Sequence, residues 1–266
     1  MNFKRVITAL VLFPLLILIL LKANIFLISS LIFITAFLCF YEWKNLYELS
    51  WPLWILGEAL LIINLFLIFK FNISIFFVLY IFFLFSFLPY LFKYEKENFK
   101  KSFFPFFVGL VYVFIGLYPF WEILQSFKRE YLVYFFSVVF ANDTGAYLTG
   151  KLIGKTPFFS KISPKKTWEG FLGGIIFALL IAIFINHYWS LFLIKANILI
   201  AITLAIIGSM GDLLESAFKR AVNKKDSGGI IVGHGGMLDR LDGVLFSSPL
   251  FLFFLKNNII NIWSCL

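Results

Sequence analysis

The sequence is poor in charged residues, which make up only 14% of its 266 positions, whereas hydrophobic residues make up 62%. Soluble domains are about 25% charged and about 45–50% apolar. The composition therefore excludes a soluble globular protein and predicts an all-α polytopic membrane protein. The 38 Phe residues need no cofactor to explain them, because they supply lipid-facing bulk.

Cysteine and histidine are also scarce, with two residues of each. Cys39 lies within an apolar run and Cys265 next to the last residue, so no disulfide framework is indicated. No Cys and His set fits a zinc site. The net charge of +9 does not indicate nucleic-acid binding, because basic loops on one side of a bilayer give the same excess.

Long apolar runs predict about nine membrane-spanning helices, since a helix needs about 20 apolar residues to cross a bilayer. About five spans form an N-terminal region, 1–130, of which residues 1–120 carry little chemical information. About four spans and two polar loops form a catalytic region, 131–266. The expected spans cover residues 6–21, 25–41, 53–69, 73–92, 103–120, 131–149, 171–189, 196–216 and 243–262.

The distribution of basic residues predicts the orientation. If the N-terminus is cytoplasmic, nine spans place 17 of the 23 Lys and Arg residues in the cytoplasm and 6 on the other side. Cytoplasmic loops carry such an excess. Both long polar loops, 150–170 and 217–242, then face the cytoplasm. The expected location is the cell inner, or plasma, membrane, with the lipid bilayer as a partner.

The first polar loop follows Asp143, a carboxylate inside the sixth expected span. Such a residue is costly in a membrane and indicates function, although an Asp at the interface is the alternative. Ser163 and Pro164 predict an N-cap and the first residue of the next helix. Lys165 and Lys166 would then form an anion site on its first turn. Anchoring to anionic headgroups is the alternative for these lysines.

The second polar loop begins on the eighth expected span. Asp212 shares one helical face with Glu215, Ser216 and Lys219, at spacings of 3, 4 and 7. Two carboxylates and a cation on one face indicate a site. An internal salt bridge at the helix end is the alternative.

The loop then continues through five glycines to the ninth expected span. Asp239 and Asp242 lie one helical turn apart there, and Asp239 is expected to converge with Asp212. Two carboxylates, completed by waters and phosphates, are how Mg²⁺ is usually held. Glycine amides and cations hold phosphates. His234 fits a phosphate contact or a structural role in the loop equally well.

These residues resemble the signature of the phosphatidate cytidylyltransferases, or CDP-diacylglycerol synthases. Val232 departs from the signature, which usually has Pro or Gly there. An earlier similarity runs from Asn142 to Gly150 and from Ser163 to Gly170. The signature is matched at Ser216, Phe218, Lys219, Arg220, Lys225, Asp226, Gly228, Ile231, His234, Gly235, Gly236, Met237, Asp239, Arg240, Leu241 and Asp242.

The resemblance implies an enzyme that joins phosphatidate to CTP with Mg²⁺, in a family also associated with K⁺. It implies Asp212 and Asp239 as the metal carboxylates, with Asp143 and Asp226 as further catalytic carboxylates. Assembly as a homodimer is left open. The substrate-binding residues implied are Ser163, Lys165, Lys166, Thr167, Ser216, Lys219, Arg220, Lys225, His234, Gly235, Gly236 and Arg240.

Four other functions compete with this one. An anion transporter would place binding residues near the bilayer midplane in broken, repeated helices. A CDP-alcohol phosphatidyltransferase would carry a signature that is absent here. A CTP-dependent polyprenol kinase is the nearest enzymatic rival, and the long match at 216–242 argues against it. A purely structural membrane protein would not need a loop so dense in Asp, Lys and Gly.

Overall fold

The computed structural model describes residues 3–71, 75–92, 102–229 and 235–257. These segments are mainly helical, and an isolated β-bridge joins Pro157 to Thr167. Each expected span overlaps one helix, which confirms the all-α fold class. The helices are α1 (Phe3–Lys22), α2 (Ile25–Tyr47), α3 (Trp51–Phe71), α4 (Ile75–Phe92), α6 (Phe104–Ser126), α7 (Glu130–Ile153), α8 (Trp168–Trp189), α9 (Ile194–Ala221) and α10 (Leu238–Lys256).

Five of the described helices, α2, α3, α6, α8 and α9, are long and apolar enough to cross a membrane. Helix α8 shows how its sequence divides between lipid and protein. Large side chains at a spacing of four residues, Leu172, Ile176, Leu180 and Phe184, are exposed along one stripe. The small residues buried on α8 are Gly170, Gly173, Gly174, Ala178 and Ala182. These small residues let α7 approach closely, as is common between membrane helices.

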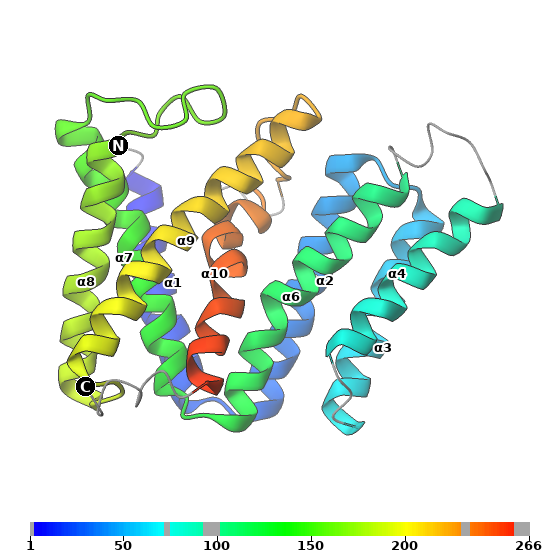
Figure 1. Cartoon of the computed structure of the whole chain (residues 1–266), viewed down its shortest axis with the longest axis horizontal. Coiled ribbons are helices and arrows are strands. Elements are labelled where there is room, and N and C mark those ends of the chain that lie inside the picture. Colours follow the sequence, from blue (N-terminus) through cyan, green and yellow to red (C-terminus); the bar gives the residue numbers. More distant parts are fainter. Residues whose placement is uncertain (1–2, 72–74, 93–101, 230–234, 258–266) are drawn as a thin grey trace.

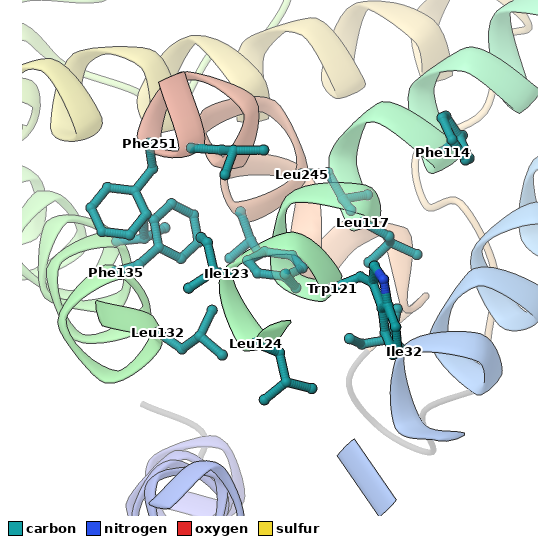
Figure 2. Close-up of a cluster of buried hydrophobic side chains, with 14 of the residues drawn as sticks. Ile32, Phe114, Leu117, Trp121, Ile123, Leu124, Leu132, Phe135, Leu245 and Phe251 are labelled. Carbon is teal, nitrogen blue, oxygen red and sulfur yellow. The ribbon is translucent and has the colours of Figure 1, made fainter. Parts of the chain in front are cut away.

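Helix α10 lies between α9 and α6 in the middle of the bundle (Figure 1). Its apolar side chains join a core with α6 and α7, in which Phe251 packs on Phe135 with ring centroids 5.2 Å apart (Figure 2). A hydrogen bond also ties α10 to α6, because the Ser248 hydroxyl donates to the Gly116 carbonyl at 2.6 Å. Helix α10 is thereby packed against both α6 and α7.

Helices α9 and α10 cross closely at glycine. A Cβ atom at Gly211 would lie 2.7 Å from the Asp242 carbonyl oxygen and 2.6 Å from Cβ of Phe246. Only a residue without a side chain allows this approach. The crossing brings the polar ends of both helices together, with Asp212 next to Gly211 on α9 and Asp242 on α10.

Both polar segments lie at one end of the bundle, the upper end in Figure 1. Helix α1 begins at this end, and α10 ends at the opposite one. The chain from the start of α1 to the end of α10 therefore runs from one end of the bundle to the other, as an odd number of membrane crossings requires. The position of both polar segments at the same end supports the expectation that they share one side of the membrane.

The predicted N-cap at Ser163 is wrong. Helix α8 begins at Trp168, and the Thr167 hydroxyl caps it by accepting from the Gly170 amide at 3.2 Å. Lys165 and Lys166 therefore precede the helix instead of lying on its first turn. The reason is that the Lys166 carbonyl accepts from the Phe158 amide at 2.8 Å, which holds this segment in a turn.

The close crossing generates a prediction about two glycines one turn apart on α9. Gly211→Ala should lower the free energy of unfolding by about 1–3 kcal/mol, because the added methyl group overpacks the crossing. Gly208→Ala is the matched control, since its Cβ would meet its nearest atoms only at 3.8 and 3.9 Å. The control should be neutral, or more stable by about 0.5–1 kcal/mol. Thermal unfolding in detergent measures both, and equal effects would contradict the close packing.

Candidate active site

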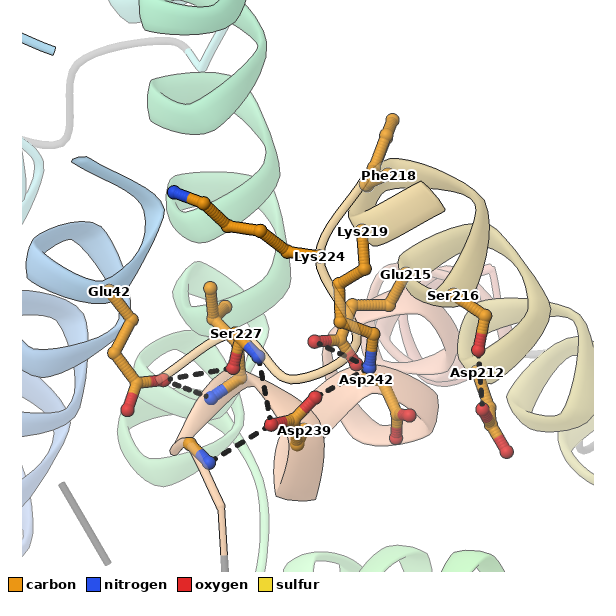
Figure 3. Close-up of polar contacts among 12 residues, drawn as sticks. Glu42, Asp212, Glu215, Ser216, Phe218, Lys219, Lys224, Ser227, Asp239 and Asp242 are labelled. Carbon is orange, nitrogen blue, oxygen red and sulfur yellow. Dashed lines mark hydrogen bonds and ion pairs between the residues drawn. The ribbon is translucent and has the colours of Figure 1, made fainter. Parts of the chain in front are cut away.

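The site is built from facing polar residues at the C-terminal end of α9 and the N-terminal end of α10 (Figure 3). Lys219 on α9 forms ion pairs with Asp239 on α10 and, at 3.5 Å, with Glu215 one turn back on α9. Glu215 is only 1% exposed. Lys219 therefore joins the two helices in a setting where its charge is shielded little by water.

Asp239 organises the segment between these helices. Its Oδ1 atom pairs with Lys219, while its Oδ2 atom accepts from the backbone amides of Ser227 at 3.1 Å and Gly236 at 2.9 Å. Gly235 adopts φ +84°, a conformation that favours glycine. A Cβ atom there would also lie 3.1 Å from Oδ2 of Asp239. Gly235 and the Gly236 amide thus serve a carboxylate of the protein itself, and the expected contact of these glycine amides with phosphates stays a prediction.

Asp212 is engaged by a different cation. Lys166 of the first polar segment reaches its Oδ2 atom at 2.7 Å and also donates to the Ser209 carbonyl at 3.3 Å. The Ser216 hydroxyl lies 3.5 Å from Oδ1 of Asp212. The Asp212 side chain remains 40% exposed. The two polar segments therefore meet at a carboxylate that still faces open space.

A further carboxylate comes from α7. Asp143 lies close enough to Asp212 and Asp242 for their charges to repel, with Lys166 as an opposing cation. Buried Asn142 donates to Oδ1 of Asp143 at 3.4 Å and to the Ser209 hydroxyl at 3.1 Å. Three helices thus concentrate negative charge around Asp212.

The described residues contain no group of three His, Cys, Asp or Glu side chains that forms a ready metal cage. Mg²⁺ needs only one or two protein carboxylates when waters and substrate phosphates complete its shell. The donor set is all oxygen, and the surplus of carboxylates around Asp212 favours a cation. The carboxylates around Asp212 therefore fit Mg²⁺, whereas both oxygens of Asp239 already accept hydrogen bonds from Lys219, Ser227 and Gly236. The expected convergence of Asp239 with Asp212 stays a prediction.

The first polar segment is shaped by Glu169. Its carboxylate accepts from the amides of Lys155 and Thr156 at 3.1 Å and from the Thr156 hydroxyl at 2.8 Å. These bonds hold the segment against the start of α8. Lys165 is left exposed beside it, while Lys166 turns toward α9.

The other predicted site residues are placed more peripherally. Arg220 is exposed and donates to the Lys224 carbonyl at 2.9 Å. Lys225, Asp226 and Arg240 are exposed at the same end of the bundle. His234, like Ile231 and Val232, falls outside the described residues.

Sequence reasoning missed a residue of α2. Glu42 is 1% exposed, and its Oε2 atom accepts from the Ser227 hydroxyl at 3.3 Å and from the Leu238 amide at 2.9 Å (Figure 3). Nearby, the Lys224 ammonium donates to the Asn45 carbonyl at 2.8 Å. The sequence signal was an acidic residue directly after the expected span 25–41. Its partners lie 185 and 196 residues away, beyond the reach of local patterns.

The model of the cytidylyltransferase family matches residues 3–257 of this chain. The chain belongs to the cytidylyltransferase family. It is also similar to proteins named phosphatidate cytidylyltransferase from Staphylococcus haemolyticus (44% identity over 147 residues), Staphylococcus epidermidis (42% over 144) and Staphylococcus aureus (43% over 145). Each match covers 54% of this chain and 55% of the relative, so it spans about half the length of these family members. The family resemblance drawn from the sequence is confirmed.

The Lys219 ion pairs generate a prediction about stability. Lys219→Met should lower the free energy of unfolding by about 3–5 kcal/mol, because it leaves buried Glu215 and Asp239 without their cation. Lys256→Met is the control, since Lys256 pairs at 2.7 Å with Glu122 and is nearly half exposed. It should cost about 0–1 kcal/mol. Thermal unfolding in detergent compares the two, and a Lys219 effect no larger than the control would refute the buried pairing.

Proposed function

We propose that this protein transfers the CMP moiety of CTP to phosphatidate and forms CDP-diacylglycerol and pyrophosphate. The observation that carries the proposal is the meeting of both polar segments at Asp212, through Lys166, at one end of an apolar helix bundle. A nucleotide from the cytoplasm and a lipid from the bilayer would meet at such a place. Membership of the cytidylyltransferase family and the names of the relatives support the same reaction.

In the proposed step, a phosphate oxygen of phosphatidate attacks the α-phosphorus of CTP in line. The new P–O bond forms as the bond to the β-phosphate oxygen breaks, and pyrophosphate leaves with its electron pair. The nucleophile is already ionised near neutral pH, so no strong general base is required. The difficulty is to bring two polyanions together, and catalysis then depends on positioning and charge neutralisation.

The residues of the site divide this task. Asp212 and Asp239 would hold Mg²⁺, which would neutralise charge on the α-phosphate and the leaving group. Exposed Lys165, Arg220 and Lys225 would bind the phosphates of CTP and the lipid headgroup. Since Lys166 is paired with Asp212, it would be shared between this carboxylate and a phosphate.

The remaining predicted residues would complete the binding surface. Asp143 and Asp226 would orient cations or join the metal shell, and K⁺ would be a second cation. Ser163, Thr167, Ser216, Lys219, His234, Gly235, Gly236 and Arg240 would contribute to substrate binding. The site would face the cytoplasm from the inner, or plasma, membrane, where CTP is available.

A transfer assay tests the proposal on the purified full-length protein in detergent. With phosphatidate, Mg²⁺, K⁺ and CTP labelled at the α-phosphate, label should enter the lipid and pyrophosphate should be released. EDTA should abolish the reaction. Asp239→Asn should lower it at least about a hundredfold, because the variant loses both the proposed metal carboxylate and the charge that pairs with Lys219.

Glu122→Gln is the matched control, because it removes an acidic charge whose ion pair is with Lys256, near the other end of α10. It should keep wild-type activity. Absence of labelled lipid from folded protein would reject the function, and assays for polyprenol kinase activity and anion transport would follow. An active, folded Asp239→Asn variant would reject the metal assignment alone.

A further inference from the structure

Glu42 belongs to α2, in the part of the chain that the family signature does not include, yet it contacts the signature segment at two points. Its Oε2 atom accepts from the Ser227 hydroxyl at 3.3 Å and from the Leu238 amide at 2.9 Å. We call these two contacts the Glu42 clamp. Both are buried, so water cannot replace them readily.

The contact with Leu238 substitutes for a helix cap. Leu238 is the first residue of α10, and Met237 before it supplies no side-chain cap. The first amides of a helix lack partners within the helix and need an acceptor from elsewhere. Glu42 provides it from another helix. Asp239 is the next residue, so its position depends on how this first turn is held.

The contact with Ser227 holds the opposite side of the same segment. Ser227 donates its hydroxyl to Glu42 and its backbone amide to Asp239. One residue therefore links the two carboxylates. A Cβ atom at Gly228 would lie 2.8 Å from Oε1 of Glu42, and one at Gly236 would lie 2.6 Å from its Oε2 atom. The Glu42 carboxylate thus fills the space beside Gly228, and shares the space beside Gly236 with the Ser227 hydroxyl, whose oxygen would lie 2.1 Å from that Cβ atom.

We infer that Glu42 is a positioning residue for the transfer reaction, which holds Asp239 and its neighbours 226–229 and 235–238 in their active arrangement without touching the substrates. This inference rests on the proposed function. It places part of the active site's support in α2.

The first test compares variants of the full-length protein in the labelled-CTP assay. Glu42→Ala should lower kcat about a hundredfold with little change in the KM for CTP, since a small displacement of a reacting centre costs that much. Glu42→Gln should stay within about fivefold of wild type, because its carbonyl oxygen accepts the same two hydrogen bonds. A Glu42→Ala variant with wild-type kcat, or a Gln variant as impaired as the Ala variant, would overturn the clamp.

Glu58→Ala is the matched control. Glu58 is also a buried acidic residue, but it lies on α3, and no described hydrogen bond or ion pair joins it to the residues 216–229 or 235–242. It should keep wild-type kcat. An equal loss in Glu58→Ala and Glu42→Ala would show a general effect of removing buried acids and overturn the inference.

A double-mutant cycle and a structural readout complete the test. Ser227→Ala should lower kcat by less than Glu42→Ala, and the double variant should fall no further than Glu42→Ala alone, because the two groups share one hydrogen bond. Independent, multiplying effects would overturn the clamp. If Glu42→Ala does not fold, Glu42→Gln and Ser227→Ala still test it.

Trypsin cleavage after exposed Lys225, followed by mass spectrometry, measures the clamp without any activity. It should be several times faster in Glu42→Ala than in wild type or Glu58→Ala. Unchanged cleavage would overturn the inference. If wild-type protein makes no labelled lipid, the proposed function fails, whereas the cleavage rates still decide whether Glu42 holds the segment.

Discussion

The ion pairs of Lys219 hold the two helices of the site together. Glu215 and Asp239 come from different helices and are both acidic, so without a cation between them their repulsion would oppose the packing of α9 on α10. A buried cation is itself costly unless it is paired and hydrogen-bonded. The Lys219 ammonium and the two carboxylates therefore stabilise one another. This arrangement requires α9 and α10 to approach closely enough for one lysine to reach both carboxylates.

The glycine crossing meets this requirement. Gly211 lets α10 approach α9, and the next residue of α9 is Asp212. Packing of small residues and placement of charge are thus two results of the same local sequence. The Asp239 carboxylate then extends the order outward, because it accepts two amides of the connecting segment. Helix packing, ion pairing and loop conformation are coupled in that order.

The spans were predictable because the bilayer fixes how many apolar residues a helix needs. Their ends were less so. Helix α9 continues to Ala221 and α10 begins at Leu238, since polar residues extend a helix beyond the apolar run. The cap at Ser163 was mispredicted because the local Ser-Pro signal ignores the backbone pairing of Phe158 with Lys166. The shared face of Asp212, Glu215 and Lys219 follows from helical spacing alone, and the structure adds their partners.

Glu42 shows where sequence reasoning ends. Nothing adjacent to it in sequence distinguishes it from an interfacial acid at the end of a span. Its structural role is visible only in its contacts with Ser227 and Leu238, which are distant in sequence and are brought next to it by the fold. The glycine amides of this segment were expected to hold phosphates. In this structure the space beside Gly228 is filled by the Glu42 carboxylate, and the space beside Gly236 by the Ser227 hydroxyl together with Glu42. Residues of a signature segment can therefore be required for packing against another helix, here α2, as well as for binding substrate. For that reason helix α2, which lies outside the signature, contacts the polar segment directly through Glu42.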